Sequence, residues 1–155
     1  MEVETKKTER VADILEGELN NTIHAWVRLV EEDSDLSGIP LNFEARTGHL
    51  PVLLNDVITR LRLDRGTKSL DSVAASHHGK ARYKQGYTVG MVVDESQILE
   101  VSIFSMLHRN QNRVVFSELL PDVPIIADEV DAQLKQHLLG FRPDDFVEKN
   151  ESPKS

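Results

Sequence analysis

Apolar residues recur every three or four positions along most of the chain, and strand-like alternation of apolar and polar residues is scarce. The first series runs from Val11 to Val30 and forms one helical face at about 100° per residue. Thr8 is placed to cap this helix at its N-terminus. The polar segment Glu31–Pro40, with Asp, Ser and Gly residues that favour turns, ends it. We therefore predict one helix over residues 11–30.

Two more helices are predicted in the stretch that follows. Pro51 suits the first turn of a helix whose apolar face extends to Leu61, and Gly66 breaks that helix. Ser69 is placed to cap the next helix, which ends at Gly86, a residue suited to the left-handed conformation. The apolar face of this next helix is predicted to carry Leu70, Val73, Ala74, His77 and Ala81.

A fourth helix begins after a very short corner. Thr88 stands two positions after Gly86 and is placed to cap it. Because the connection is so short, the third and fourth helices should be neighbours in space. The inward face of the fourth helix is predicted to carry Val89, Val92, Glu95, Ser96, Leu99, Ile103, Met106 and Leu107.

The last predicted helix starts at Asp122, which is placed to cap it, with Pro124 in its first turn. Gly140 and Pro143 are expected to end it. The preceding segment, residues 114–120, fits either a short helix or a turn-rich connection. The apolar face of the last helix is predicted to carry Val123, Ile126, Ala127, Val130, Leu134 and Leu138.

These elements predict an all-α protein, a single bundle of five or six helices, with globin-like packing open as one arrangement of it. The bundle is expected to occupy residues 1–141. The charged segment 142–155 has little apolar content after Phe146 and is expected to be disordered.

The amino-acid composition excludes several classes of site and disfavours others. The chain has 155 residues, a single domain by length, and no cysteine, which excludes a disulfide framework, a thiol nucleophile, a thiolate zinc site and an iron–sulfur cluster. Its formal charge of −8 opposes a general electrostatic attraction to nucleic acid or to an anionic membrane. No stretch approaches the roughly 20 apolar residues of a membrane span, and Met1–Glu9 lacks the apolar core of a secretion signal. We expect a cytoplasmic protein.

Known catalytic and metal-binding motifs are missing from the sequence. It contains six histidines, but neither His-x-x-x-His nor His-Glu-x-x-His spacing. It has no Gly-x-Ser-x-Gly motif and no glycine-rich phosphate loop. No enzyme activity, metal site or cofactor is therefore predicted.

The richest polar segment lies around the corner between the third and fourth helices. His78 and Arg82 stand four residues apart and share one helical face, and Glu95 lies two turns into the next helix. Tyr87 lies at the corner itself. A carboxylate near Arg82 or His78 would form a charge-assisted pair. Two interpretations stay open: an interhelical clamp that fixes the corner, or the lining of a small pocket for an anion or another ligand.

The same segment carries a resemblance to a known family. The run HHGKARYKQGYTVGMVVDESQILEVSIFSML resembles the helical input domain at the N-terminus of RsbT co-antagonist proteins of the RsbRD type, a domain that also precedes the kinase core in a set of bacterial histidine kinases. Weaker similarity in the helices around Trp26 and Leu53 extends the resemblance over residues 8–139. The residues that match the family pattern in order are His78, Gly79, Arg82, Gly86, Tyr87, Thr88, Glu95, Ile98 and Leu99.

The resemblance implies a sensory or regulatory bundle, often dimeric, that passes a signal to a kinase or STAS-type output domain. The family often has Arg after the Leu-Leu-type pair, whereas this chain has Glu100. The sequence contains neither a kinase dimerisation motif nor a STAS-type domain, so an output domain would act in cis on a longer chain or in trans.

Three functional hypotheses follow. The first is a non-enzymatic signal-input module that works as a homodimer, with His78, Arg82, Tyr87 and Glu95 as its ligand site or clamp. The second is a haem- or metal-binding protein of globin-like type. The third is a small helical enzyme for an anionic substrate, with His78 as the base and Arg82 as the substrate clamp.

Overall fold

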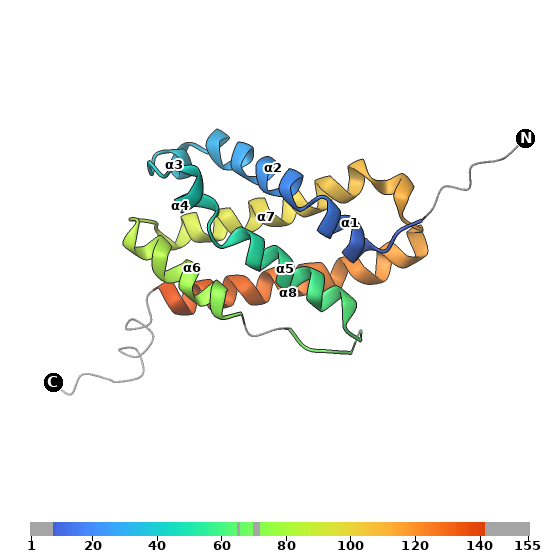
Figure 1. Ribbon diagram of the computed structural model, residues 1–155. Coiled ribbons are helices and arrows are strands. Elements are labelled where there is room, and N and C mark those ends of the chain that lie inside the picture. Colours follow the sequence, from blue (N-terminus) through green and yellow to red (C-terminus); the bar gives the residue numbers. More distant parts are fainter. Residues whose placement is uncertain (1–7, 65, 70–71, 142–155) are drawn as a thin grey trace, which may run out of the picture.

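The computed structural model describes residues 8–64, 66–69 and 72–141. Within these ranges every regular element is a helix and no strand occurs, which confirms the predicted all-α class. The helices pack into one bundle, as predicted (Figure 1). The expected disorder of residues 142–155 lies outside the described residues.

The bundle is built on long helices joined by short ones. Figure 1 shows the two longest, α7 and α8, side by side along its length. None of the described helices is both long enough and apolar enough to span a membrane. The elements are α1 (Val11–Gly17), α2 (Leu19–Glu32), α3 (Ser34–Ser37), α4 (Phe43–Thr47), α5 (Leu50–Arg62), α6 (Val73–Lys84), α7 (Val89–Arg109), the 3₁₀ helix η1 (Gln111–Arg113) and α8 (Phe116–Phe141).

The helix predicted over residues 11–30 is divided into α1 and α2, so the single-helix prediction is wrong. The break falls at Glu18, which has φ −99° and ψ 15° and follows Gly17, a residue with low helix propensity. Arg10, rather than Thr8, precedes the first helical turn and provides no side-chain cap. The break lets both halves turn apolar side chains, such as Leu15 of α1 and Trp26 of α2, into the core.

The start of α6 also differs from the prediction. Ser72, not Ser69, caps the helix, because its Oγ accepts a hydrogen bond from the N–H of Ala75 at 3.2 Å. The same hydroxyl donates to Asp56 of α5 at 2.7 Å, which fixes where α6 begins. Leu70, predicted on the apolar face of this helix, lies outside the described residues.

The buried face of α6 is not the predicted one. Val73 and His77, both expected to face inward, are exposed. Apart from Gly79, each buried position lies one residue after a predicted one, so the buried face is rotated by about 100° around the axis of α6. This polar face can be buried because its groups find partners on other helices. The face consists of Ala75, His78, Gly79 and Arg82.

The corner between α6 and α7 follows the prediction. Gly86 has φ 92°, a conformation that side chains other than glycine's rarely tolerate. Thr88 caps α7, since its Oγ1 accepts from the N–H of Met91 at 3.2 Å. The backbone N–H of Tyr87 bonds to the carbonyl of Arg82 at 3.0 Å, which closes the end of α6.

Helix α8 is longer than predicted at its N-terminus. It begins at Phe116, so residues 117–120 are helical and the cap predicted at Asp122 is wrong. Pro121 and Pro124 lie inside it, and each removes one backbone donor. The carbonyls that lose these donors belong to residues 117 and 120, which are exposed and can bond to water instead.

Two glycines bring α6 and α8 into close contact. A Cβ atom on Gly79 would overlap the backbone of His137, with the Cα of His137 only 2.9 Å away. A Cβ atom on Gly140 would overlap the backbone of Ser76, with the carbonyl carbon of Ser76 also 2.9 Å away. Gly140 therefore does not end the helix as predicted; it continues α8 and lets α6 approach.

The inner face of α8 carries polar side chains as well as the predicted Ile126 and Val130. Glu129 is fully buried and pairs with Arg60 of α5 at 2.8 Å. Gln133 is buried too, and its amide donates to a backbone carbonyl of α5 at 2.8 Å. His137 follows at the same four-residue spacing and is also buried. Hydrogen bonds to α5 thus help to position α8.

Candidate functional site

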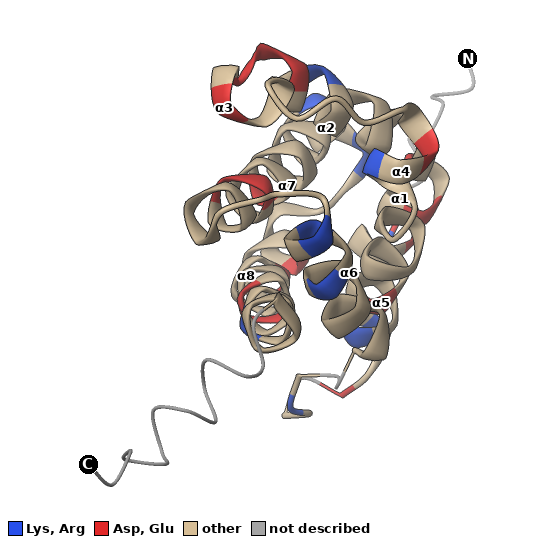
Figure 2. Cartoon of the chain, turned by 90° about the vertical axis from the view of Figure 1, so that its left-hand side faces the viewer, with Lys and Arg blue, Asp and Glu red and all other residues tan. Residues whose placement is uncertain are grey.

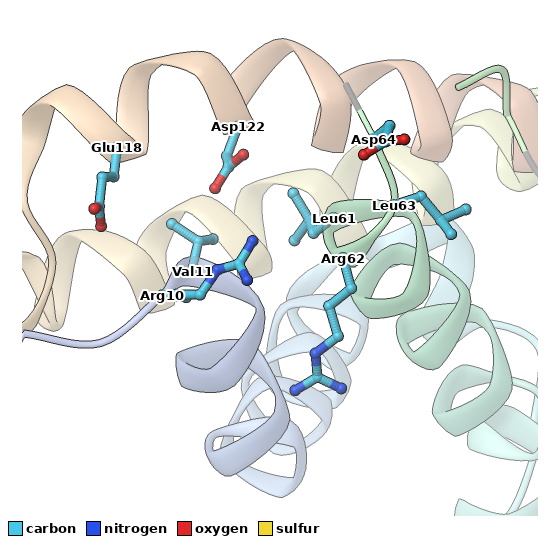
Figure 3. A pocket seen from close by; sticks show the side chains of 8 residues that line it. All are labelled: Arg10, Val11, Leu61, Arg62, Leu63, Asp64, Glu118 and Asp122. Atoms are coloured by element: carbon cyan, nitrogen blue, oxygen red, sulfur yellow. The ribbon is translucent and has the colours of Figure 1, made fainter. Parts of the chain in front are cut away.

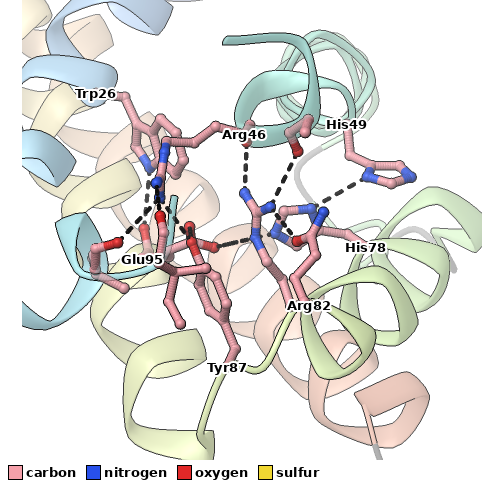
Figure 4. Close-up of polar contacts among 11 residues, drawn as sticks. Trp26, Arg46, His49, His78, Arg82, Tyr87 and Glu95 are labelled. Atoms are coloured by element: carbon pink, nitrogen blue, oxygen red, sulfur yellow. Dashed lines mark hydrogen bonds and ion pairs between the residues drawn. The ribbon is translucent and has the colours of Figure 1, made fainter. Parts of the chain in front are cut away.

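The structure brings together all four residues predicted at the α6–α7 corner (Figure 4). Arg82 Nε donates to Glu95 Oε1 at 2.8 Å, and the Tyr87 hydroxyl donates to Glu95 Oε2 at 2.7 Å. His78 Nε2 lies 3.4 Å from Glu95 Oε1. All four residues are at least 96% buried. The charge-assisted pair predicted between Arg82 and a carboxylate is therefore present, and Glu95 is the centre of the cluster.

Arg82 has no exposed surface, and each of its three side-chain nitrogens donates to an acceptor within the protein. Besides Glu95, the acceptors are the carbonyls of Ala45 at 3.2 Å and Arg46 at 2.6 Å, and the side chain of Gln85 at 2.8 Å. Its guanidinium also lies over the Tyr87 ring, 4.8 Å from the centroid. Arg82 thus ties α6 to α7 and to α4.

Arg46 is a member of this cluster that the sequence analysis missed. Its guanidinium donates to the Tyr87 hydroxyl at 3.0 Å and to the carbonyl of Ile39 at 2.6 Å. It belongs to α4, a five-residue helix capped by Asn42 and too short to show an apolar period. The Asn42 cap was the available local signal, but nothing in the spacing points from α4 to a corner some 40 residues later.

Trp26 joins the cluster to α2. Its indole N–H donates to the backbone carbonyl of Glu95 at 3.2 Å, and the ring is buried. Trp26 is the only tryptophan in the sequence, so its fluorescence reports on this part of α7. The predicted role of Trp26 on an inward-facing stripe is confirmed, with this polar contact in addition.

Three histidines form a row beside the cluster. The Nδ1 atoms of His49 and His78 are 3.3 Å apart, so one of the two must carry the proton that they share. If His78 donates through Nε2 to Glu95, its Nδ1 is the acceptor and His49 is the donor. On the other side, the ring of His137 packs edge-on against His78, with centroids 4.8 Å apart. The row connects the N-cap of α5 with α6 and α8.

Burial and charge act in opposite directions on Glu95. Burial alone raises the pKa of its carboxyl, but the hydrogen bond from His78 and the positive charge of Arg82 outweigh it, so the pKa lies below its usual range. Burial, with the Glu95 charge nearby, raises the pKa of Tyr87. Burial lowers the pKa of His78. Glu95 is thus charged at neutral pH, whereas Tyr87 and His78 are neutral.

Little open space adjoins the cluster. One cavity, of about 10 Å³, lies between Trp26, His78 and Glu95 on one side and Gln133 and His137 of α8 on the other. Such a volume suits one water molecule at most. Within the part of the chain that the structure describes, no group of three or more His, Asp or Glu side chains is arranged to hold a metal ion.

A larger pocket, of about 530 Å³, lies far from this cluster, between α1, the end of α5 and the start of α8 (Figure 3). Arg10, Arg62, Asp64, Glu118 and Asp122 contribute its charges. Arg62 pairs with two carboxylates of α1, at 2.8 and 2.7 Å. The pocket contains none of the four predicted site residues.

Comparison with family models, with characterised proteins and with solved structures finds no match to this chain. The family suggested by the sequence motif, and the globin-like arrangement, therefore both stay predictions. The geometry of the corner is the observation on which a function can be proposed.

The free energy of unfolding should depend on pH because His137 is buried. Burial lowers the pKa of His137 to about 3, against 6.5 for an ordinary histidine. Above pH 6.5 His137 is neutral in both the folded and the unfolded state. As the pH falls from 6.5 towards 3, His137 is protonated in the unfolded state only. Folding should therefore weaken, by on the order of 2 kcal/mol between about pH 6.5 and pH 5 for this one group.

Urea unfolding at about pH 7.5 and about pH 5 measures this loss. His137→Gln should reduce the difference between the two pH values, because the titrating group is gone. His77→Gln, on the exposed side of α6, is the matched control and should keep the wild-type difference. An unchanged difference in His137→Gln would show that His137 titrates normally in the folded protein.

Proposed function

We propose that the chain is a non-enzymatic signal-input or regulatory module. It responds to a ligand or a protein partner at the His78–Arg82–Tyr87–Glu95 cluster and passes the change through α8 to an output domain, in cis or in trans. The observation that carries the proposal is that the helix bearing His78 and Arg82, α6, packs against α8 more closely than side chains other than glycine would allow.

The packing of α6 on α8 supports a mechanical link between the cluster and α8. The ring of His78 contacts Glu95 on one side and the ring of His137 on the other. Figure 2 shows basic positions along α6 and acidic positions on α7 and α8. Since Gly79 and Gly140 leave almost no free space between α6 and α8, a displacement of α6 must be accompanied by a displacement of α8.

The enzyme alternative finds less support in this geometry. It assigns Arg82 to an anionic substrate, but all three side-chain nitrogens of Arg82 already donate to the protein. A haem or metal site at this cluster would need a histidine with a free ring nitrogen beside an open space. His78 has contacts through both ring nitrogens, and the adjoining cavity measures about 10 Å³.

The module is proposed to work as a homodimer through the outer side of α7. Two grooves lie there, of about 740 and about 430 Å³, and both are lined by Phe104 and His108. Val101 and Phe116, which line one groove each, are apolar and more than half exposed. Exposed apolar surface of this kind is typical of protein–protein contacts.

The charges beside the first groove suit a second copy of the same helix. Glu100 lies before Phe104 on α7, and Arg109 lies after it. If two copies of α7 pair antiparallel about a two-fold axis near Phe104, Glu100 of each copy faces Arg109 of the other. Burial and the nearby charge of Asp131 raise the pKa of Glu100, so its charged form is unfavourable there. Arg109 of a second copy would stabilise that charge.

Native mass spectrometry of the purified chain tests the proposed homodimer and, in the same spectrum, the cofactor alternative. We expect a dimer for the wild type and a monomer for Phe104→Glu, which places a charge in the groove. Val73→Glu changes an apolar residue on α6 that is 68% exposed and lines neither groove, so it should leave the dimer intact. A wild-type monomer, or a dimer that Phe104→Glu does not weaken, would contradict the homodimer; a haem or metal ion retained at full stoichiometry would favour the cofactor alternative instead.

A further inference from the structure

Two buried polar atoms on α8 have no hydrogen-bond partner among the described residues. They are Oε1 of Gln133 and Nε2 of His137. The two residues are 98% and 94% buried, so bulk water does not reach these atoms. Leaving a buried polar atom unpaired costs about 1–3 kcal/mol, so two in one place call for an explanation.

Both residues line the same small cavity. They stand four positions apart on α8, hence on one face of the helix, and the cavity between them and α7 measures about 10 Å³. A single water molecule needs roughly 10–15 Å³ by this measure and two to four polar partners. His78, Glu95 and Ser96 also line the cavity and offer further polar atoms.

Rotation of the Gln133 amide would not satisfy both ends of that side chain. Its Nε2 already donates to the carbonyl of Leu53 at 2.8 Å, so an exchange of the amide oxygen and nitrogen would break a buried hydrogen bond. The oxygen must therefore find a donor on the cavity side. Nε2 of His137 can be a donor or an acceptor depending on the tautomer, and a water molecule complements either form.

We propose that this cavity is a binding site for one internal water molecule, which donates a hydrogen bond to Gln133 Oε1 and forms a second with His137 Nε2. The water completes the polar contacts of α8 where that helix passes the His78–Glu95 pair. It is a structural component of the folded chain and is present without any other ligand.

Crystallography at a resolution that shows ordered water tests the proposal on the full chain. The wild type should show one water at full occupancy, within hydrogen-bond distance of both atoms. His137→Phe removes Nε2 and fills the cavity with a larger ring, and this variant should contain no water there. His77→Phe makes the same exchange on the exposed side of α6 and should keep the water.

If His137→Phe does not fold, Gln133→Met replaces it, because this side chain has a similar length and no amide. Nuclear Overhauser contacts between water and the neighbouring amide protons give the same result in solution. An empty cavity with both side chains placed as they are here would overturn the proposal. Direct hydrogen bonds from Gln133 Oε1 and His137 Nε2 to protein groups, or an ion in place of water, would overturn it too.

Discussion

Arg82→Met is expected to lower the free energy of unfolding by about 3–5 kcal/mol, the usual loss when one partner of a buried ion pair is removed. The substitution leaves Glu95 buried and charged without its main partner. It also leaves the carbonyls of Ala45 and Arg46 without a donor. Urea unfolding at neutral pH measures the loss, and the fluorescence of Trp26 reports the transition.

Arg62→Met is the matched control. Arg82 pairs with one carboxylate and Arg62 with two, Asp13 and Glu16, but the side chain of Arg62 is 42% exposed. Solvent screens exposed pairs of this kind, so the control should lose far less stability than Arg82→Met. If the two variants were equally stable, the corner cluster would not be a structural clamp, and a role confined to ligand binding would become the better interpretation of Arg82.

Gly79→Ala and Gly140→Ala should each destabilise the bundle by at least 1–3 kcal/mol, roughly the cost of overpacking a core. In both variants the new methyl group would overlap backbone atoms of the facing helix, which cannot move aside as a flexible side chain could. The two helices must separate, and the contact between His78 and His137 must loosen. Thermal unfolding of the two variants measures the effect.

Gly90→Ala, in contrast, should stabilise the protein. Gly90 lies in the first turn of α7, and an added Cβ would meet only the Thr88 hydroxyl oxygen, at 3.8 Å. Alanine at such a position stabilises a helix by about 0.4–1 kcal/mol. Equal effects of the three substitutions would show that α6 and α8 are not in the close contact described above.

The sequence was most informative where structure depends on neighbouring residues. Gly86 and Thr88 define the end of α6 and the start of α7, and both predictions are confirmed. Each depends only on the local backbone: a positive φ at Gly86 and a backbone N–H three residues after Thr88. The start of α5 beside Pro51 is confirmed for the same reason. His78, Arg82 and Glu95 were placed together because helical spacing and a short corner leave few alternatives.

The sequence was least informative where burial depends on a distant partner. The inward face of α6 was predicted from apolar residues, but Arg82 and His78 are buried there because α4, α5 and α7 supply their partners. The sequence favours Gly140 as a helix end, whereas in the structure its lack of a side chain allows the close contact with α6. Arg46 gave no signal at all, since only the folded chain brings α4 to the corner.

Hydrogen exchange of the backbone amides, measured by mass spectrometry, tests the central claim that the cluster and α8 are coupled. Glu95→Gln removes the central charge of the cluster and keeps the size of the side chain. Leu15→Ala, in the core of α1, is the control for lost stability, with an expected cost of about 2–5 kcal/mol. We expect exchange over residues 132–141 of α8 to be faster in Glu95→Gln than in Leu15→Ala. If both variants showed the same pattern, with α8 no more affected than α1 or α5, the proposed coupling would be wrong.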